Sequence, residues 1–468
     1  MNKKQHEKLK FLPQVGSLLE TQALQNLSIE YSHDLVKKCC NDVIKAAREA
    51  ILDRGEDPPS LDEFVQSVQD RVAVFLKPRL KRVINATGII LHTGLGRAPL
   101  VEDIYQRAFD RVKAACSLEL DMLTGKRGDR QCVLEDLITF LTGADAAAVV
   151  NNNAAAVMLS LNTLAYRKET IVSRGQLIEI GGSFRLPEIM RKSGTKLVEV
   201  GTTNRTYLED YTEAITPKTR AVLVAHSSNY RVKGFVHEAE IEEIAPACRE
   251  RGVFVIHDLG GGVLIDLEKS GLPHEPVVQE SVKSGVHVAT FSGDKVLGGP
   301  QCGILVGDSG TIGKICKNPM MRALRPDKFT LALLEETLRI YLEPDKFISR
   351  HPVLKRLSED QSEAMRRAKQ LYDLISQVEL SEKVRILLTE STGQLGSGAL
   401  PLHEFPSAAL KIKVRGIPVS KLAAELRTAE LPIIGYVRRD YLFLDVKAVM
   451  DEDIAETAHT ISQILRIY

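Results

Sequence analysis

Apolar positions in the first eighty residues recur every three or four residues, a spacing that predicts amphipathic helices. The first set is Val36, Cys40, Val43, Ala47 and Ile51, and the second is Leu61, Phe64, Val68, Val72 and Phe75. Ser60, followed three residues later by Glu63, has the pattern of a capping box that begins the second helix. Residues 1–80 are therefore predicted to form a separate helical module.

From about residue 81, short apolar runs typical of β-strands alternate with helical segments. This alternation predicts a parallel α/β sheet with helices on both faces. Strands are expected at 147–150, 196–200, 221–225, 253–256, 288–291 and 304–306.

The C-terminal part begins with helical patterns at 328–342 and 345–375. Strands and helices then alternate from Val384 to the end, which indicates a small α/β domain. The predicted domains are a helical N-terminal module at 1–80, a large domain at 81–340 and a small C-terminal domain at 341–468.

Composition narrows the class of protein. The 468 residues, 44% hydrophobic and 26% charged, suit a protein of two or three domains. A net charge of +1 gives no global attraction to nucleic acid or membrane, so a polyanion would need a local basic patch. Neither a signal-peptide pattern nor an apolar run near the roughly 20 residues of a membrane span is found, so we expect a cytoplasmic protein. The seven cysteines form no C-x-x-C pair and no zinc-type spacing, so we expect neither disulfides nor structural metal.

Polar residues follow several predicted strands. Ligands of open α/β sheets bind outside the carboxyl ends of the strands, so these segments are expected to meet at one site. They are 151–153, 201–205, 226–229, 258–261 and 292–295.

Lys295 is the centre of the predicted site. It follows an apolar run in the order Ser292-Gly293-Asp294-Lys295 and precedes Gly298 and Gly299. A lysine on a small-residue turn beyond a buried strand can form a Schiff base with an aldehyde cofactor, and Ser292 would reach that cofactor's phosphate. This pattern predicts an enzyme that uses pyridoxal 5'-phosphate (PLP). The alternative, an ordinary surface lysine, has to be judged with the neighbouring residues.

Those neighbours supply the other parts of a PLP site. Asp258 would keep the pyridine nitrogen protonated, and the alternative is a turn or N-cap aspartate. Asn152, Asn153 and Ala154 open an Ala-rich helix whose amides and dipole would bind the phosphate, although a simple Asn cap is the commoner use of such a segment. His226 would stack on the cofactor or hydrogen-bond it, and the alternative is a structural histidine.

Characteristic segments are spread along nearly the whole chain. They are RVINATGIILHTGLGRAPL (82–100), LTGKRGDR (123–130), NNNAAAV (151–157), SRGQLIEIGGSFRLPEIM (173–190), EVGTTNRT (199–206), HSSNYRVKGF (226–235), DLGGG (258–262), FSGDKVLGGPQCGILVG (291–307) and RALRPDKFTLALLEETLRIY (322–341). Through these segments the chain resembles the bacterial selenocysteine synthase family, the L-seryl-tRNA(Sec) selenium transferases. The opening Leu12-Pro13-Gln14-Val15 resembles that family's N-terminal module. Departures from the family pattern include Gly94, Cys116, Met122 and Gly261.

The resemblance implies a PLP-dependent transferase of fold type I. It also implies a ring-shaped homodecamer, a pentamer of dimers with active sites between subunits, and an N-terminal module that binds tRNA. By motif, Arg97, Arg322 and Arg325 correspond to the arginines that bind the selenophosphate oxyanion, a role that suits the guanidinium fork. Without the resemblance, Arg322 and Arg325 would be taken for solvated arginines.

The implied reaction converts seryl-tRNA(Sec) to selenocysteinyl-tRNA(Sec). The seryl amine displaces Lys295 from PLP, and the freed lysine removes the Cα proton. Loss of the hydroxyl leaves an aminoacrylyl group, to which selenium from selenophosphate adds. Asp294 would tune Lys295 or assist loss of the hydroxyl, unless it is only a turn residue.

Two other functions stay open at this point. One is another fold-type-I PLP lyase or aminotransferase acting on a small amino acid, against which the N-terminal module counts. The other is a tRNA or selenium carrier without catalysis, against which the lysine, aspartate and phosphate-site set counts.

Overall fold

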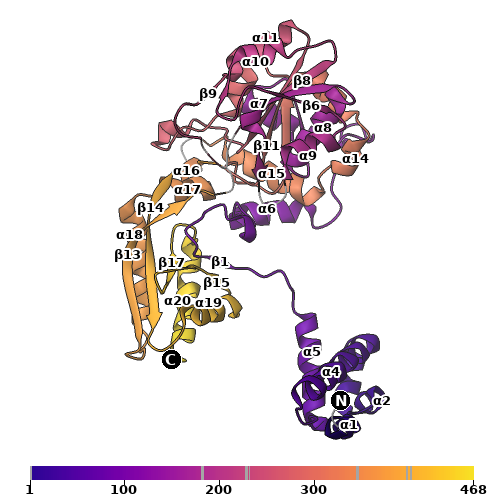
Figure 1. The fold of residues 1–468 in the computed structure, drawn as a ribbon, viewed down its shortest axis with the longest axis vertical. Coiled ribbons are helices and arrows are strands. Elements are labelled where there is room, and N and C mark those ends of the chain that lie inside the picture. The colour runs from indigo at the N-terminus through magenta and orange to yellow at the C-terminus, as the bar shows by residue number, and fades with distance from the viewer. Residues whose placement is uncertain are drawn as a thin grey trace. The chain divides into compact units, whose positions relative to one another are not determined.

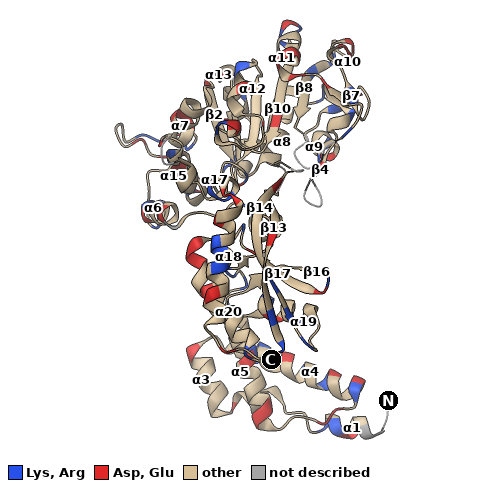
Figure 2. Cartoon of the chain, turned by 90° about the vertical axis from the view of Figure 1, so that its left-hand side faces the viewer, with Lys and Arg blue, Asp and Glu red and all other residues tan. Residues whose placement is uncertain are grey.

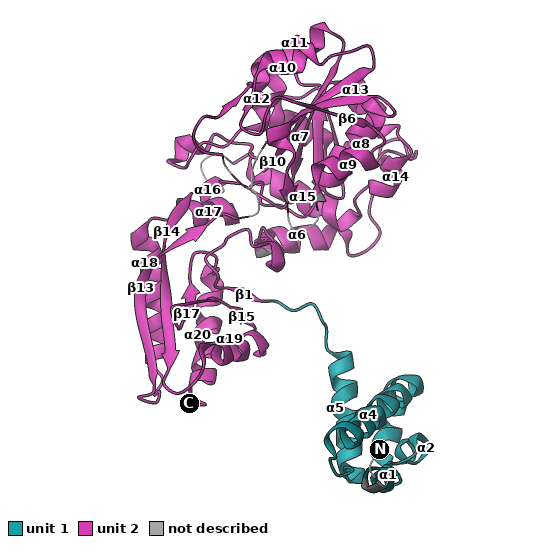
Figure 3. Ribbon diagram, in the orientation of Figure 1, with its two compact units in different colours: residues 1–82 teal, residues 83–468 magenta. Residues whose placement is uncertain are grey.

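The computed structural model describes residues 3–180, 184–226, 230, 232–343, 347–396, 399–400 and 403–468. The chain divides into two compact units, Met1–Arg82 and Val83–Tyr468, which are coloured separately in Figure 3.

The first unit is helical. Its helices are α1 (Lys3–Leu9), α2 (Val15–Leu19), α3 (Gln22–Glu30), α4 (His33–Arg54) and α5 (Leu61–Leu76). The predicted capping box is confirmed: Ser60 Oγ accepts from the Glu63 N–H at 3.3 Å, and Glu63 Oε2 accepts from the Ser60 N–H at 2.7 Å. Leu18, Leu24, Val36 and Phe64 lie in one buried core, so this unit encloses its own apolar side chains.

A seven-stranded sheet forms the centre of the second unit (Figure 1). Its order is β2 (Ala146–Val150), β12 (Gly303–Gly307), β11 (Val288–Ser292), β10 (Phe254–Gly260), β8 (Thr219–Ala225), β3 (Glu169–Ser173) and β6 (Lys196–Val200). The predicted strands are present, and β3 is an addition to them. All strands run parallel except β12, which is antiparallel to both β11 and β2. The connection from β11 to β12 is too short for the crossover that a parallel pair requires.

Helices cover both faces of this sheet, which is why its strands read as continuous apolar runs. Ala147 and Val149 pack on the face covered by α7 (Cys132–Thr142), α11 (Ile241–Glu250), α12 (Val278–Lys283) and α15 (Lys328–Ile340). Ala148 and Val150 pack on the other, with α8 (Asn153–Ala165), α9 (Leu186–Lys192) and α13 (Ser309–Cys316).

The C-terminal part carries a four-stranded antiparallel sheet in the order β13 (Val384–Gln394), β14 (Glu404–Val414), β17 (Tyr441–Asp445) and β16 (Tyr436–Arg438). The helices α18 (Gln361–Ser376), α19 (Val419–Thr428) and α20 (Ile454–Leu465) pack on it. The helical pattern predicted at 345–375 is divided among α16 (Phe347–Arg350), α17 (Pro352–Ser358) and α18, because Pro352 and the Asp360 cap each begin a new helix.

The segment at 84–101 runs from the small sheet to the large one. Its strand β1 (Ile84–Asn85) pairs with β15 (Ile433–Ile434), and Ile84 and Ala86 lie in the core of the C-terminal part. The segment then passes Arg97 and enters α6 (Glu102–Val112).

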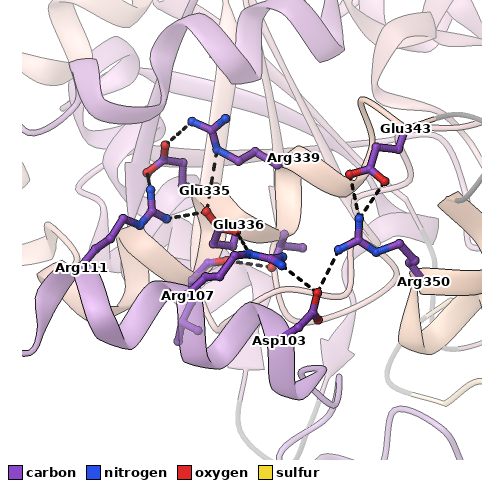
Figure 4. A network of polar contacts seen from close by, with 10 residues as sticks. Asp103, Arg107, Arg111, Glu335, Glu336, Arg339, Glu343 and Arg350 are labelled. Atoms are coloured by element: carbon purple, nitrogen blue, oxygen red, sulfur yellow. Dashed lines mark hydrogen bonds and ion pairs between the residues drawn. The ribbon is translucent and has the colours of Figure 1, made fainter.

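A network of ion pairs holds α6 against α15 (Figure 4). The buried Glu336 carboxylate accepts from Arg107 Nε at 2.6 Å and from Arg111 Nη2 at 2.7 Å. Glu335 pairs with Arg111 and Arg339, and Asp103 extends the network to Arg350. These contacts fix the end of the segment that brings Arg97 to the large sheet.

None of the helices within the described ranges is long and apolar enough to span a membrane.

Candidate active site

Lys295 lies in the turn between β11 and β12, just beyond the carboxyl end of β11. The residue is 6% exposed. Glycines permit this turn, because a Cβ at Gly293 would collide with Cys302 Sγ and Gly298 has a left-handed φ of 77°. Lys295 is therefore held inside the protein and is not a surface lysine.

Burial lowers the pKa of Lys295, since the ammonium form loses hydration. The negative charge of Asp258 opposes this shift, and the positive charge of Arg97 adds to it. Asp294 and Glu275 also oppose it, more weakly. A lysine displaced toward its neutral form suits attack on a carbonyl and uptake of a proton.

Asp258 stands on β10, beside β11, and is 6% exposed. Its Oδ1 accepts from Asn153 Nδ2 at 2.7 Å and from Thr290 Oγ1 at 3.1 Å. Burial raises the pKa of Asp258, while these donors and Lys295 lower it. A cationic ring nitrogen beside this carboxylate would hold it in its ionised form.

The start of α8 lies against the beginning of β12. Asn152 Oδ1 caps α8 by accepting from the Ala155 N–H at 2.8 Å, so the ordinary cap is present. A Cβ at Gly303 would collide with the Asn152 carbonyl, and Gly303 pairs in register with Ser292. The buried Ser292 is thereby brought close to the N-terminus of α8, where the N–H groups of Asn153 and Ala154 belong to the first turn.

His226 follows β8. Its N–H donates to the Asp258 carbonyl at 2.9 Å, and its Nε2 lies 3.4 Å from Glu275 Oε1. The neighbouring His257 is buried, and this burial, together with His226, lowers the pKa of His257 to about 3. Residues 227–229, the rest of this predicted strand-end segment, lie outside the described residues.

Arg97 binds the residue next to Lys295. Its Nη1 donates to Asp294 Oδ2 at 2.7 Å, and the Ala98 N–H donates to the Asp294 carbonyl at 3.2 Å. Arg97 has a φ of 64°, a left-handed conformation that is uncommon for a residue with a side chain. Such strained positions concentrate at functional sites.

Arg322 and Arg325 line a cavity of about 300 Å³ together with Glu119, Arg130 and Gln131. Glu119 Oε1 accepts from Arg130 Nε at 2.8 Å and from Arg325 Nη1 at 3.2 Å. The described residues that line this cavity do not include Arg97 or Lys295. A backbone bond from the Asn151 N–H to the Leu324 carbonyl, at 2.8 Å, nevertheless ties this segment to the beginning of α8.

Glu119 and Glu275 were not predicted from the sequence. Glu275 stands in a loop, in the order Pro273-His274-Glu275-Pro276, with no strand before it and no motif around it. Only its position in the folded protein, beside His226, identifies Glu275 as a residue of the candidate site.

A family model described as L-seryl-tRNA selenium transferase matches residues 83–450. The chain belongs to this family. The L-seryl-tRNA(Sec) selenium transferase of Alkaliphilus oremlandii is 40% identical over 462 residues, covering 97% of this chain and 98% of that protein. The enzyme of the same name from Desulfotalea psychrophila is 42% identical over 453 residues, covering 95% and 96%.

Among solved structures, D-glucosaminate-6-phosphate ammonia-lyase is similar with a TM-score of 0.55 and 18% identity, covering 82% of this chain and 96% of that one. At this identity the likeness shows the fold alone. The predicted fold class, fold type I with a mostly parallel large sheet and a helical N-terminal region, is confirmed.

We predict that Lys295 is the residue that binds PLP covalently in this member of the selenium transferase family. The purified protein should be yellow, and borohydride reduction followed by peptide mapping should place the pyridoxyl group on Lys295. The variant Lys295→Ala should fold but stay colourless. Label on another lysine would contradict the assignment.

Proposed function

We propose that this chain converts L-seryl-tRNA(Sec) to L-selenocysteinyl-tRNA(Sec) with selenium from selenophosphate. The observation that carries the proposal is the 40% identity to a named transferase over 97% of the chain, which includes the helical first unit as well as the large sheet. We place the reaction in the cytoplasm, where aminoacyl-tRNA is used.

PLP fits the residues at the strand ends. Lys295 would bind its aldehyde carbon, Asp258 would face its ring nitrogen, and Ser292 with the first amides of α8 would bind its phosphate. Asn153 Oδ1 is buried and has no hydrogen-bond partner among the described residues, as expected of a side chain beside an absent polar group. When bound, PLP supplies the electron sink that lets the seryl Cα lose its proton.

The chain's own residues supply the acid and base groups. Lys295 Nζ, buried and shifted toward its neutral form, takes the proton from Cα. Asp294 is held in one orientation by Arg97, and we propose that it assists departure of the seryl hydroxyl. His226, at the end of β8, donates its N–H to the Asp258 carbonyl, and we propose that its ring would contact the cofactor from there.

The selenium donor is an anion, and fixed arginines suit it. Arg97 lies at Asp294, while Arg322 and Arg325 lie in a cavity joined to the start of α8. We propose that these three arginines bind the donor in the assembled enzyme.

The first unit offers a local basic surface for tRNA. Lys38, Arg71, Lys77, Arg79 and Lys81 line a cavity of about 460 Å³ in which Asp42 is the one acidic lining residue among those described. Phe75, 56% exposed, lies in it with Lys38 Nζ at 5.9 Å from its ring. Along the rest of α4, Figure 2 shows both basic and acidic residues. Clustered cations suit a phosphate backbone, and an exposed ring suits an unstacked base.

We further propose a homo-oligomer, with the decamer as its form. Large apolar side chains are exposed on α6, α7 and the loop between them, and subunit contacts would cover them. They are Tyr105, Phe109, Leu120, Met122, Leu123, Val133 and Phe140.

The function is tested by mixing purified protein with seryl-tRNA(Sec) and selenophosphate. Selenocysteinyl-tRNA should form, and omission of selenophosphate should abolish it. Turnover of a free small amino acid with no conversion of the seryl-tRNA would instead indicate a lyase or aminotransferase.

Removal of residues 1–82 should leave a folded, yellow protein that no longer retains seryl-tRNA(Sec), because each unit has its own core. In the full chain, Arg71→Ala with Arg79→Ala should weaken tRNA binding. The slope of log affinity against log salt should become shallower by roughly 1 for each phosphate that these arginines no longer neutralise. The control is Lys45→Ala with Arg48→Ala, exposed residues of α4 outside the cavity. Equal effects of the two pairs would contradict a tRNA site at this cavity.

Arg97→Ala or Arg325→Ala should lower selenium transfer roughly a hundredfold under limiting selenophosphate, because a fixed donor to the anion is removed. Colour and tRNA binding should be retained. Lysine at either position should restore little, since an ammonium group cannot form the paired bonds of a guanidinium. Transfer at the parent rate in the alanine variants would show that the donor binds elsewhere.

A further inference from the structure

Glu275 is a buried acid that the reaction as described above does not use. It lies between η3 (Leu267–Ser270) and α12, and it is 6% exposed. Its Oε1 is buried and has no hydrogen-bond partner among the described residues. Burying a carboxylate oxygen without a hydrogen bond lowers the stability of the fold. A buried acid of this kind therefore indicates a role in the site.

Three strand ends of the candidate active site surround this carboxylate. His226 Nε2, beyond β8, lies 3.4 Å from Oε1. The position of a Cβ on Gly261, just beyond β10, lies 3.6 Å from Oε1, so the absent side chain leaves room there. The turn that carries Lys295 also reaches this place, because the N–H of the next residue, Val296, donates to the Gly261 carbonyl at 3.1 Å.

Glu275 differs from the other two carboxylates that act on Lys295. Asp258 accepts hydrogen bonds from Asn153 and Thr290, and Asp294 is paired with Arg97. For Glu275 the described partner is the imidazole of His226, at a distance that is long for a hydrogen bond. Its negative charge is therefore the least compensated of the three.

We propose that Glu275 is a positioning residue of this site, which holds His226 through Nε2 and acts as a fixed negative charge on Lys295 across the gap at Gly261. The inference rests on the proposed function only in that Lys295 is taken as the cofactor lysine. The charged or titratable groups that face Lys295 are then Asp258 on β10, Asp294 in its own turn, Arg97 from the segment at 84–101, and Glu275. His226 lies 3.4 Å from Glu275 through its Nε2, and its charge contributes to lowering the pKa of the buried His257.

The sign of the effect follows from the charge. A negative group stabilises the protonated form of Lys295, so its removal lowers the pKa of Lys295 further. In the full chain purified without PLP, trace acetylation of Lys295, followed by mass spectrometry across a pH series, should give a lower titration point in Glu275→Gln. At neutral pH, acetylation of Lys295 should be roughly threefold faster, because a larger fraction of the lysine is neutral. His226 should also react faster with diethyl pyrocarbonate, because its Nε2 is no longer held.

The PLP-bound enzyme allows a second measurement. The midpoint pH at which the absorbance of the bound cofactor changes should be lower in Glu275→Gln than in the parent protein. Glu268→Gln is the matched control, because Glu268, in η3, also lies near a histidine, 3.3 Å from His274, but at an exposed position where solvent screens the pair. In this control, the titration point of Lys295 and the pH dependence of the absorbance should both be the same as in the parent protein.

A parent-like titration of Lys295 in Glu275→Gln would overturn the proposal. If that variant does not fold, Gly261→Ser decides, because a serine hydroxyl at this position can donate to Oε1 and Gly261 has no left-handed φ to oppose it. This variant should also lower the titration point of Lys295, by a smaller amount than Glu275→Gln. An unchanged titration point would overturn the proposal as well. Acetylation of the protein without PLP does not depend on which reaction the enzyme catalyses. Failure of the proposed function is therefore distinguishable from failure of this proposal. If PLP is bound by another lysine, peptide mapping will show it separately.

Discussion

The burial of two charged residues, Lys295 and Asp258, at the ends of neighbouring strands is the constraint on which the rest of the site depends. Removing an ammonium and a carboxylate from water costs several kcal/mol per ion, and this cost is offset only if both groups have partners in good geometry. Asn153 and Thr290 supply donors to Asp258. These contacts to Asp258 require that β10, β11 and the first turn of α8 come together in one register.

The segment at 84–101 joins this charge system to the rest of the second unit. It enters the core of the small sheet through Ile84, places Arg97 on Asp294, and continues into α6. There the buried Glu336 holds Arg107 and Arg111. Contacts between acidic residues and arginines therefore occur both at the site and between α6 and α15. The strained backbone at Arg97 lies between two fixed elements, β1 before it and α6 after it.

Local patterns were sufficient for much of the fold. Helical spacing predicted α4 and α5, and Ser60 with Glu63 marked where α5 begins, because a capping box is made within four residues. The apolar runs predicted the strands, since both faces of the large sheet are buried. The direction of β12 was not predicted, because it depends on the length of one connection and on the pairing of β12 with both β11 and β2.

The same division applies to the site. The sequence by itself determined that Lys295, Asp258, Ser292 and the start of α8 lie at strand ends of one sheet, because each directly follows an apolar run. Their roles as site residues are predictions. It also determined the family, through motifs spread along the chain. Only the tertiary structure decided that Asn153 binds Asp258, that Arg97 binds Asp294, and that Glu275 stands beside His226. These contacts join residues that are distant along the chain, and no local spacing records which loop folds over which strand end.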